Sequence, residues 1–129
     1  MRNKLPTDRT SIVHEFSISG TEGEIVVGLY EDGAPGEVFL HVAKSGSFVS
    51  GLFDGMAVLV STALQHEVPL ETLAEKFTDV RFEPSGPTGN PEIPTCTSIP
   101  DYVFRWLLLR FGAKSRSNST TNGAVRNHR

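Results

Sequence analysis

The stretch EIVVGLYEDGAPGEVFLHV, residues 24–42, decides the first half of the fold. Apolar residues occupy every second position of its segments 24–30 and 38–42, which is the period of a half-buried strand. Between the two segments, EDGAPGE supplies the Asp, Gly and Pro residues that turns prefer. The stretch therefore predicts a β-hairpin with one apolar face.

A third strand is expected just before this hairpin. Residues 14–19 place Phe16 and Ile18 on one face, and GTEG at residues 20–23 marks a turn between this segment and the hairpin. Because the three segments follow one another with short connections, a three-stranded antiparallel meander is the most economical arrangement.

The apolar period changes to three and four residues between residue 47 and about residue 66, which predicts a long helix. A second set of apolar positions widens the apolar band well beyond one stripe, so we expect this helix to be central, mostly buried and packed on the sheet. Within it, Gly51 and Gly55 form a small-residue ridge that permits close approach of another element or subunit. The two apolar sets are Phe48, Leu52, Met56, Leu59 and Ala63, and Val49, Phe53, Val60 and Leu64.

Two further helices complete the predicted fold. A short helix starts at Pro69 and ends near Thr78, and a third is capped by Ser98 and ends before Gly112, where a C′ glycine belongs. Residues 102–111 of the third helix are apolar almost all round. We therefore predict an α+β fold: a three-stranded antiparallel meander packed on a long central helix, with two further helices and a disordered basic C-terminal tail.

Charge is distributed unevenly along the 129 residues, whose formal net charge is −3. Residues 10–113 carry fourteen acids and five bases, for −9, whereas residues 114–129 carry four bases and no acid, for +4. We predict a flexible N-terminus over residues 1–9, a single domain over residues 10–112 and a disordered, solubilising tail over residues 113–129. The acidic body argues against a nucleic-acid partner.

Cysteine usage and the start of the chain bear on the compartment. The single cysteine, Cys96, excludes an intrachain disulfide and a four-cysteine zinc site. The start MRNKLPTDRTS has no apolar signal-peptide core, and no uninterrupted apolar run is long enough to span a bilayer. We therefore expect a cytoplasmic protein that does not associate with a membrane.

RFEPSGPTGNPEIP, residues 81–94, is the least regular part of the body. It holds four prolines and two glycines among polar residues, so neither a helix nor a central strand is expected to run through it. Connections of this length are uncommon in compact domains and are usually functional or disordered. From the residues alone, the stretch is a linker, a disordered insert or a shaped loop.

Several stretches together carry a resemblance to a known module. FSISGTEGEIVVGLYEDGAPGEVFL, KSGSFVSGLFDGMAVLVSTALQHEVPLETLAEKF, RFEPSG, PEIP and SIPDYVFRWL resemble the domain near the C-terminus of adenosylcobalamin-dependent (class II) ribonucleotide reductases. The same module also occurs as small stand-alone proteins of the TSCPD-domain type. The resemblance covers about residues 9–111 and implies that residues 81–94 form a shaped loop.

The resemblance does not imply reductase activity for this chain alone. In the family, the chemistry lies in a much larger barrel domain that holds substrate, cobalamin and several cysteines, and the reaction needs a cysteine pair. The family signature has cysteine between serine and proline, whereas TSIPD, residues 97–101, has Ile99 there. We expect Cys96 to be a packing residue and no cofactor to bind this chain alone, although the family is associated with adenosylcobalamin.

Two stretches stand out as candidate ligand sites. KSGS, residues 44–47, opens the long helix with backbone N–H groups that suit an anion, unless a serine there is a plain N-cap. The loop at residues 81–90 offers further donors, unless it is only a rigid structural loop. We expect an anionic ligand between the two stretches and no catalytic or metal-binding residue. The candidates are Lys44, Ser45, Gly46, Ser47, Ser50, Arg81, Ser85, Thr88 and Asn90.

Three functions remain open at this point. The first is a non-catalytic binding or accessory module of nucleotide metabolism, which binds a nucleotide-like anion or a protein partner. The second is an enzyme component, a detached subunit of a split cobalamin-dependent reductase that works with the large subunit. The third is a protein that sequesters a signalling nucleotide in a phage or defence context. In each case the apolar surplus of residues 48–64 and 102–111 predicts a homodimer or higher oligomer.

Overall fold

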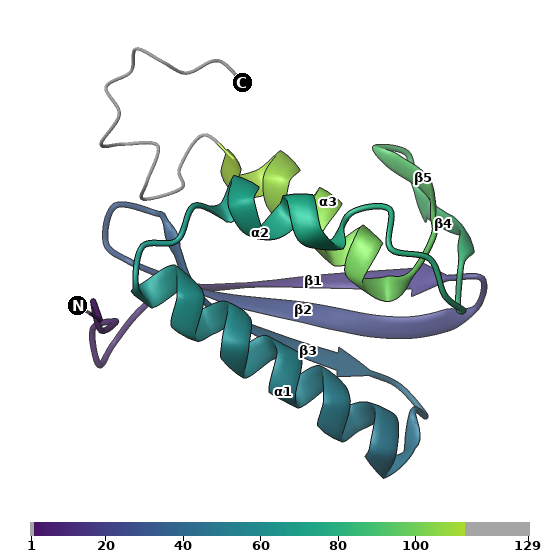
Figure 1. The fold of residues 1–129 in the computed structure, drawn as a ribbon, viewed down its shortest axis with the longest axis horizontal. Helices are drawn as coiled ribbons and strands as arrows, with labels where there is room; N and C mark the ends of the chain where they lie inside the picture. Colours follow the sequence, from purple (N-terminus) through teal and green to yellow (C-terminus); the bar gives the residue numbers. More distant parts are fainter. Residues whose placement is uncertain (1, 113–129) are drawn as a thin grey trace.

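The computed structural model describes residues 2–112 and confirms the predicted α+β fold. The predicted tail over residues 113–129 lies outside the described residues. Figure 1 shows the three-stranded sheet with helices on one side and a small second hairpin at one end. The elements in chain order are β1 (Ser11–Ile18), β2 (Thr21–Leu29), β3 (Pro35–Val42), α1 (Gly46–Gln65), α2 (Leu70–Phe77), β4 (Gly86–Asn90), β5 (Ile93–Cys96) and α3 (Ile99–Phe111).

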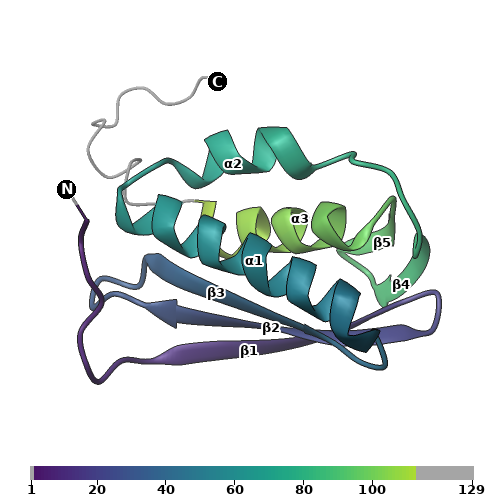
Figure 2. The same ribbon diagram turned by 60° about the horizontal axis from the view of Figure 1, so that its bottom comes forward.

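The large sheet has the order β1-β2-β3, with both pairs antiparallel. β1 and β2 meet at a two-residue turn, where Ser19 and Gly20 both have positive φ and Ile18 pairs with Thr21. A two-residue turn with positive φ at both positions twists in the same sense as the two strands that it connects. All three helices cover the same face of the sheet, so the inward residues of each strand form the core (Figure 2).

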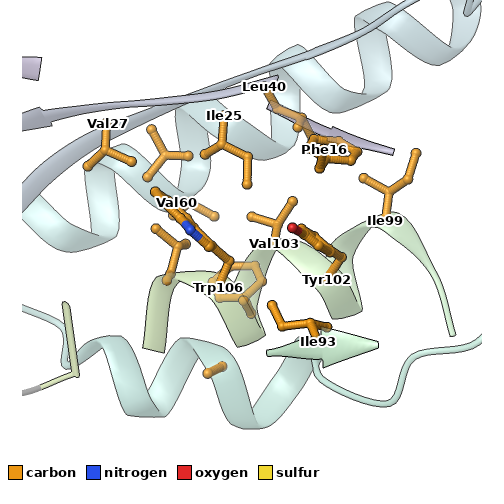
Figure 3. Packing of buried hydrophobic residues seen from close by; sticks show 14 of the residues in the cluster. Phe16, Ile25, Val27, Leu40, Val60, Ile93, Ile99, Tyr102, Val103 and Trp106 are labelled. Carbon is orange, nitrogen blue, oxygen red and sulfur yellow. The ribbon is translucent and has the colours of Figure 1, made fainter. Parts of the chain in front are cut away.

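Helix α3 is the centre of that core (Figure 3). Tyr102, Phe104 and Leu107 are each at most 1% exposed. The predicted start is confirmed, because the Ser98 hydroxyl accepts the Asp101 N–H at 3.1 Å and caps the helix. The helix ends before Gly112 as predicted, but Gly112 has helical dihedrals and not the left-handed conformation of a C′ glycine.

Asp101 joins three segments at the start of α3. Its carboxylate is 1% exposed and accepts the backbone N–H groups of Asp79 at 2.6 Å and Thr97 at 2.9 Å. It also accepts a hydrogen bond from Arg105 Nε at 2.9 Å, one helical turn further along α3. Burial acts to raise the pKa of Asp101, but these N–H donors and the Arg105 charge outweigh it and lower the pKa.

Helix α1 is long, as predicted, but it is not mostly buried. It packs on β3, and only Ala57, Val60, Leu64 and Gln65 are buried. Only Val60 and Leu64 of the second apolar set are buried, and much of the first set faces outward. By length and composition α1 is also apolar enough to cross a membrane. The core helix of a soluble protein can have the same length and composition.

Residues 81–94 contain neither a helix nor a central strand, as predicted, but they do contain two short edge strands. β4 and β5 form a two-stranded ribbon, so neither strand is central and a missing proline N–H costs no inner ladder bond. Ser19 N–H donates to Pro87 O at 2.9 Å, and Ser19 Oγ donates to Ser85 O at 2.6 Å. These bonds tie the ribbon to the β1–β2 turn, so the shaped-loop interpretation is confirmed in a more regular form.

Residues 2–9, which we predict as a flexible N-terminus, make specific contacts with the body. Arg2 Nε donates to Gln65 Oε1 at 2.6 Å, and Asn3 N–H donates to Gln65 O at 2.7 Å. The Tyr30 hydroxyl donates to Asn3 O. These bonds connect the start of the chain to the end of α1.

Candidate functional site

The main groove of the described residues has a volume of about 880 Å³ and lies between α1, α2, residues 80–84 and the adjoining ends of β2 and β3. We call it the α1–α2 groove. Pockets of about 300–1,000 Å³ with mostly apolar walls and a few polar groups are typical small-ligand sites. Its apolar lining is Val42, Ala43, Val49, Leu52, Phe53, Met56, Phe77, Val80, Phe82, Pro84, Ile99 and Pro100, and its charged lining is Glu22, Lys44, Lys76 and Glu83.

The β3–α1 junction positions Lys44 at this groove. Lys44 and Gly46 both have positive φ, at 57° and 76°, so the chain turns sharply from the strand into the helix. Ser45 occupies the N-cap position, but its side chain makes no capping hydrogen bond, and the first turn of α1 contains no acidic residue. The plain N-cap interpretation therefore does not hold for Ser45, and the positive end of the α1 dipole lies beside Lys44 and the groove.

Lys76 is a second cation at the groove, contributed by the last turn of α2. One of the two lining acids, Glu83, is used locally: its carboxylate accepts the Ser85 N–H at 3.2 Å and the Ser85 hydroxyl at 3.1 Å. Two lysines from distant segments thus accompany aromatic and aliphatic walls. This combination suits a ligand with a flat or apolar body and an anionic group.

The structure divides the predicted ligand residues among three places. Lys44 and Ser45 line the α1–α2 groove, where they meet residues 82–84 of the second predicted stretch. Thr88 and Asn90 line a different pocket. The remaining candidates line neither pocket, and they are Gly46, Ser47, Ser50, Arg81 and Ser85. Sequence reasoning missed Lys76, Phe77 and Phe82, which only the tertiary fold brings to the junction.

The TSIPD stretch forms one wall of the groove and also builds the start of α3. Ile99 and Pro100 line the groove, whereas Ser98 and Asp101 make the cap and the buried carboxylate bonds described above. The Thr97 hydroxyl donates to Val80 O at 2.9 Å and so fastens the other side of the groove. Position 99, where the family signature has cysteine, is thus a groove position.

Cys96 lies outside this lining. It is 5% exposed, and burial raises the pKa of its thiol, which disfavours the reactive thiolate. These features support the prediction that it is a packing residue.

A second pocket of about 860 Å³ lies between β1, the β4–β5 ribbon and α3. His14 stacks on Trp106 with ring centroids 4.5 Å apart, and its Nε2 lies 2.8 Å from the Tyr102 hydroxyl. Asn90 Nδ2 donates to the same hydroxyl at 3.0 Å. Burial and the nearby Arg110 charge lower the pKa of His14, so the neutral ring is favoured. His14, Tyr102 and Asn90 are therefore engaged with one another.

The comparisons with known proteins fit this geometry. A family model described as the TSCPD domain matches residues 1–110. This chain belongs to the TSCPD-domain family. The match includes the strands, the groove and the TSIPD stretch, so the family assignment covers the whole described body.

Similar sequences occur within much longer proteins, each named vitamin B12-dependent ribonucleotide reductase. The relative from Rhodopirellula baltica is 43% identical over 125 residues, which is 97% of this chain and 12% of that protein. The Streptomyces avermitilis relative is 44% identical, over 86% of this chain and 12% of that protein. The one from Bradyrhizobium diazoefficiens is 38% identical over 85% of this chain and 9% of that protein.

This TSCPD chain thus spans about an eighth of the length of its first two relatives and corresponds to their C-terminal domain. No solved structure matches it. Across residues 2–112, no group of three or more His, Cys, Asp or Glu side chains is placed to hold a metal ion. A groove of about 880 Å³ is of the size that suits a drug-sized ligand.

Proposed function

We propose that this chain is a non-catalytic binding module of nucleotide metabolism that holds a nucleotide-like anionic ligand in the α1–α2 groove. The observation that carries the proposal is that Lys44 and Lys76 both line a largely apolar groove of about 880 Å³. The relatives' association with ribonucleotide reduction supports a nucleotide rather than another anion.

The walls of the groove offer surfaces for a flat ring. Phe53, Phe77 and Phe82 come from α1, α2 and the segment before the ribbon, and all three line it. Phe82 is 45% exposed, so its ring has surface left to cover. Stacking of a nucleobase on an aromatic side chain contributes about 1–3 kcal/mol and does not depend on the identity of the base. The aromatic side chains therefore supply affinity for the apolar part of a nucleotide.

The positive groups supply affinity for a phosphate. Lys44 lies at the start of α1, whose N-cap side chain is not hydrogen-bonded and whose first turn has no acid. A helix N-terminus and a nearby ammonium together favour a negative charge. Lys76 adds a second ammonium from α2, so a phosphate would be held by two separate elements.

Binding without turnover is supported by where the perturbed titratable groups lie. Catalytic acids, bases and nucleophiles usually have shifted pKa values within the cleft that they serve. Among the described residues, the pKa values of His14, Cys96 and Tyr102 are shifted mainly by burial, and none of these side chains lines the α1–α2 groove. The lining of the groove thus contains recognition groups, but no histidine and none of these burial-shifted side chains.

Calorimetry of the purified chain tests the proposal. The panel contains adenosine and guanosine mono-, di- and triphosphates, cyclic dinucleotides and inorganic phosphate. We expect Lys44→Ala and Lys76→Ala each to weaken binding of the tightest nucleotide about ten- to a hundredfold, because a charge-assisted contact contributes about 1.5–3 kcal/mol. A cyclic dinucleotide as the tightest ligand would support the sequestration hypothesis.

Lys4→Ala is the matched control, because Lys4 is exposed and does not line the groove. It is expected to leave binding unchanged. Arg81→Ala tells whether the ligand reaches onto the 81–90 segment, as the sequence predicts. If no nucleotide binds, or if both lysine variants stay folded and bind as tightly as wild type, the proposal is wrong.

A detached subunit of a split reductase is the second candidate function. Identity of 43–44% to the C-terminal domain of complete reductases favours it, since a surface that contacts a large subunit would be retained. Adding this chain to a reductase large subunit from the same genome should then raise deoxynucleotide formation. No rise in activity and no complex in sedimentation would exclude this candidate.

A further inference from the structure

The outer face of α1 is the largest apolar feature that the groove does not account for. Phe48 is 79% exposed, Leu59 72%, Val58 64% and Leu52 60%. In Figures 1 and 2 no other described helix or strand lies against this side of α1. Asp54 is the only charged residue between Gly46 and Gln65. Soluble proteins rarely leave such a continuous apolar surface in water.

The residues on this face have a spacing that allows the face to pack against the same face of a second copy. Positions 48, 52, 55, 59 and 62 are separated by four, three, four and three residues, which is the spacing of a helix–helix seam. Gly55 lies at the middle of the helix, nine residues after Gly46 and ten before Gln65. A Cβ built on Gly51 or Gly55 meets nothing within 4 Å, so the middle of the seam is open to another helix.

Phe48 and Leu59 each have a smaller residue at the same distance on the other side of Gly55. In an antiparallel pair that crosses at this glycine, Phe48 of one copy faces Thr62 of the other, seven residues to either side. Leu59 of one copy then lies opposite Gly51 of the second copy, beside Leu52. The large Leu59 side chain therefore has the space that the missing side chain of Gly51 leaves. Antiparallel helices also oppose their dipoles, which is favourable.

We propose that two copies of this chain form a homodimer through antiparallel packing of their α1 helices, crossing at Gly55. The face forms a seam about 30 Å long on a 20-residue helix. Its exposed Phe, Leu and Val side chains amount to on the order of 600 Å² per copy, compared with about 800 Å² per partner in a standard interface. Two copies together would bury more than the total of about 1,000 Å² that a specific interface should exceed.

The other exposed apolar row of the molecule is less suited to a second copy. Val13 and Phe39 flank Val26 on the open face of the sheet. The adjacent row of that face pairs Glu15 directly with Glu24. Two copies that met through this face would bring several carboxylates together, which costs free energy. The α1 face has no such repulsion.

The dimer would also change the shape of the α1–α2 groove, whether or not a ligand binds there. Leu52 belongs both to the seam and to the lining of the groove. The second copy would therefore cover the α1 side of the groove and extend its apolar wall. A failure of nucleotide binding leaves the dimer intact as a proposal, and a monomeric chain leaves the groove intact.

Light scattering after size exclusion, at about 1–100 µM protein, tests the dimer. We expect a dimer for wild type and a monomer for Leu59→Glu, since a symmetric interface would bury two unpaired carboxylates and raise the dimer Kd by at least about a hundredfold. Leu59 is exposed and does not line the groove, so circular dichroism should show an unchanged fold. Phe39→Glu, on the open sheet face, is the matched control and should remain a dimer.

A wild-type monomer at 100 µM would overturn the proposal, as would a dimer that survives Leu59→Glu or is lost in Phe39→Glu. Sedimentation of a monomeric wild type with neutral phosphatidylcholine vesicles would instead assign the face to a membrane surface. Oxidation of mixed Phe48→Cys and Thr62→Cys proteins tests the orientation. We expect the mixed disulfide, whereas Phe48→Cys disulfides between identical chains would indicate parallel helices and overturn the antiparallel arrangement.

Discussion

Helices α1 and α3 are both rich in apolar residues, but they are used in opposite ways. α3 has thirteen residues, and nine of them are buried, from Ile99 to Phe111. α1 has twenty residues, and only four are buried. The apolar content of a helix therefore does not tell whether the fold buries it, and the difference lies in what each helix packs against.

The position of each helix on the sheet explains the difference. α3 lies between the sheet, α2 and the β4–β5 ribbon, so neighbours surround it (Figure 2). α1 packs mainly on β3, which is an edge strand, and it has described neighbours on one side only. We conclude that α3 provides stability, whereas α1 presents surface: the groove on one flank and the proposed dimer seam on the outer face.

The largest expected difference between the helices is in stability. Leu107→Ala in α3 should lower the free energy of unfolding by about 2–5 kcal/mol, because Leu107 is fully buried and its loss leaves a cavity. Leu59→Ala in α1 should change it by less than about 0.5 kcal/mol, since that side chain is 72% exposed.

Urea unfolding followed by circular dichroism measures both variants. It should be done at low protein concentration, because a dimer adds a concentration-dependent contribution to stability. Equal losses in the two variants would show that α1 is buried in the monomer as deeply as α3, which would invalidate the comparison.

A smaller effect is expected at the Asp101 carboxylate, which fastens α3 to its neighbours. Asp101→Asn should cost about 2–3 kcal/mol at neutral pH, because it removes a charged acceptor of buried N–H groups and of Arg105. Asp54→Asn on the exposed side of α1 is the matched control and should be close to neutral.

The pH dependence of this difference follows from the lowered pKa of Asp101. A carboxyl with a lower pKa in the folded state stabilises the protein fully above its unfolded pKa, about 3.9, and loses that contribution as the pH falls through the folded pKa. The gap in unfolding free energy between wild type and Asp101→Asn should therefore shrink below about pH 4. A gap that stays constant on acidification would show that the carboxylate charge does not matter.

Much of the fold could be predicted because local chemistry fixes it. The strand period, the Pro69 start of α2 and the Ser98 cap of α3 each depend on a few neighbouring residues. Which face of α1 packs on the sheet could not be predicted. The two apolar sets together cover so wide a band that either set could face the sheet. The β4–β5 ribbon was missed because proline is excluded only from central strands, and the sequence does not tell that these strands have no further neighbours.

Less of the candidate site could be predicted. Lys44 and Ser45 stand out locally, as a scarce base and a hydroxyl at a helix start, and they do line the groove. Lys76 lies in an ordinary amphipathic helix, and only the packing of α2 on α3, across the groove from α1, brings it there. Thr88 and Asn90 have the right residue types, but the turn of the ribbon carries them to the other pocket.

Hydrogen exchange measured by mass spectrometry, with and without the tightest-binding nucleotide of the calorimetric panel, tests the proposed site most directly. We predict slower exchange in residues 42–53 and 76–84, which line the α1–α2 groove, and unchanged exchange in residues 86–96 of the ribbon. Protection confined to the ribbon and to residues around His14 would place the ligand in the second pocket and contradict the account.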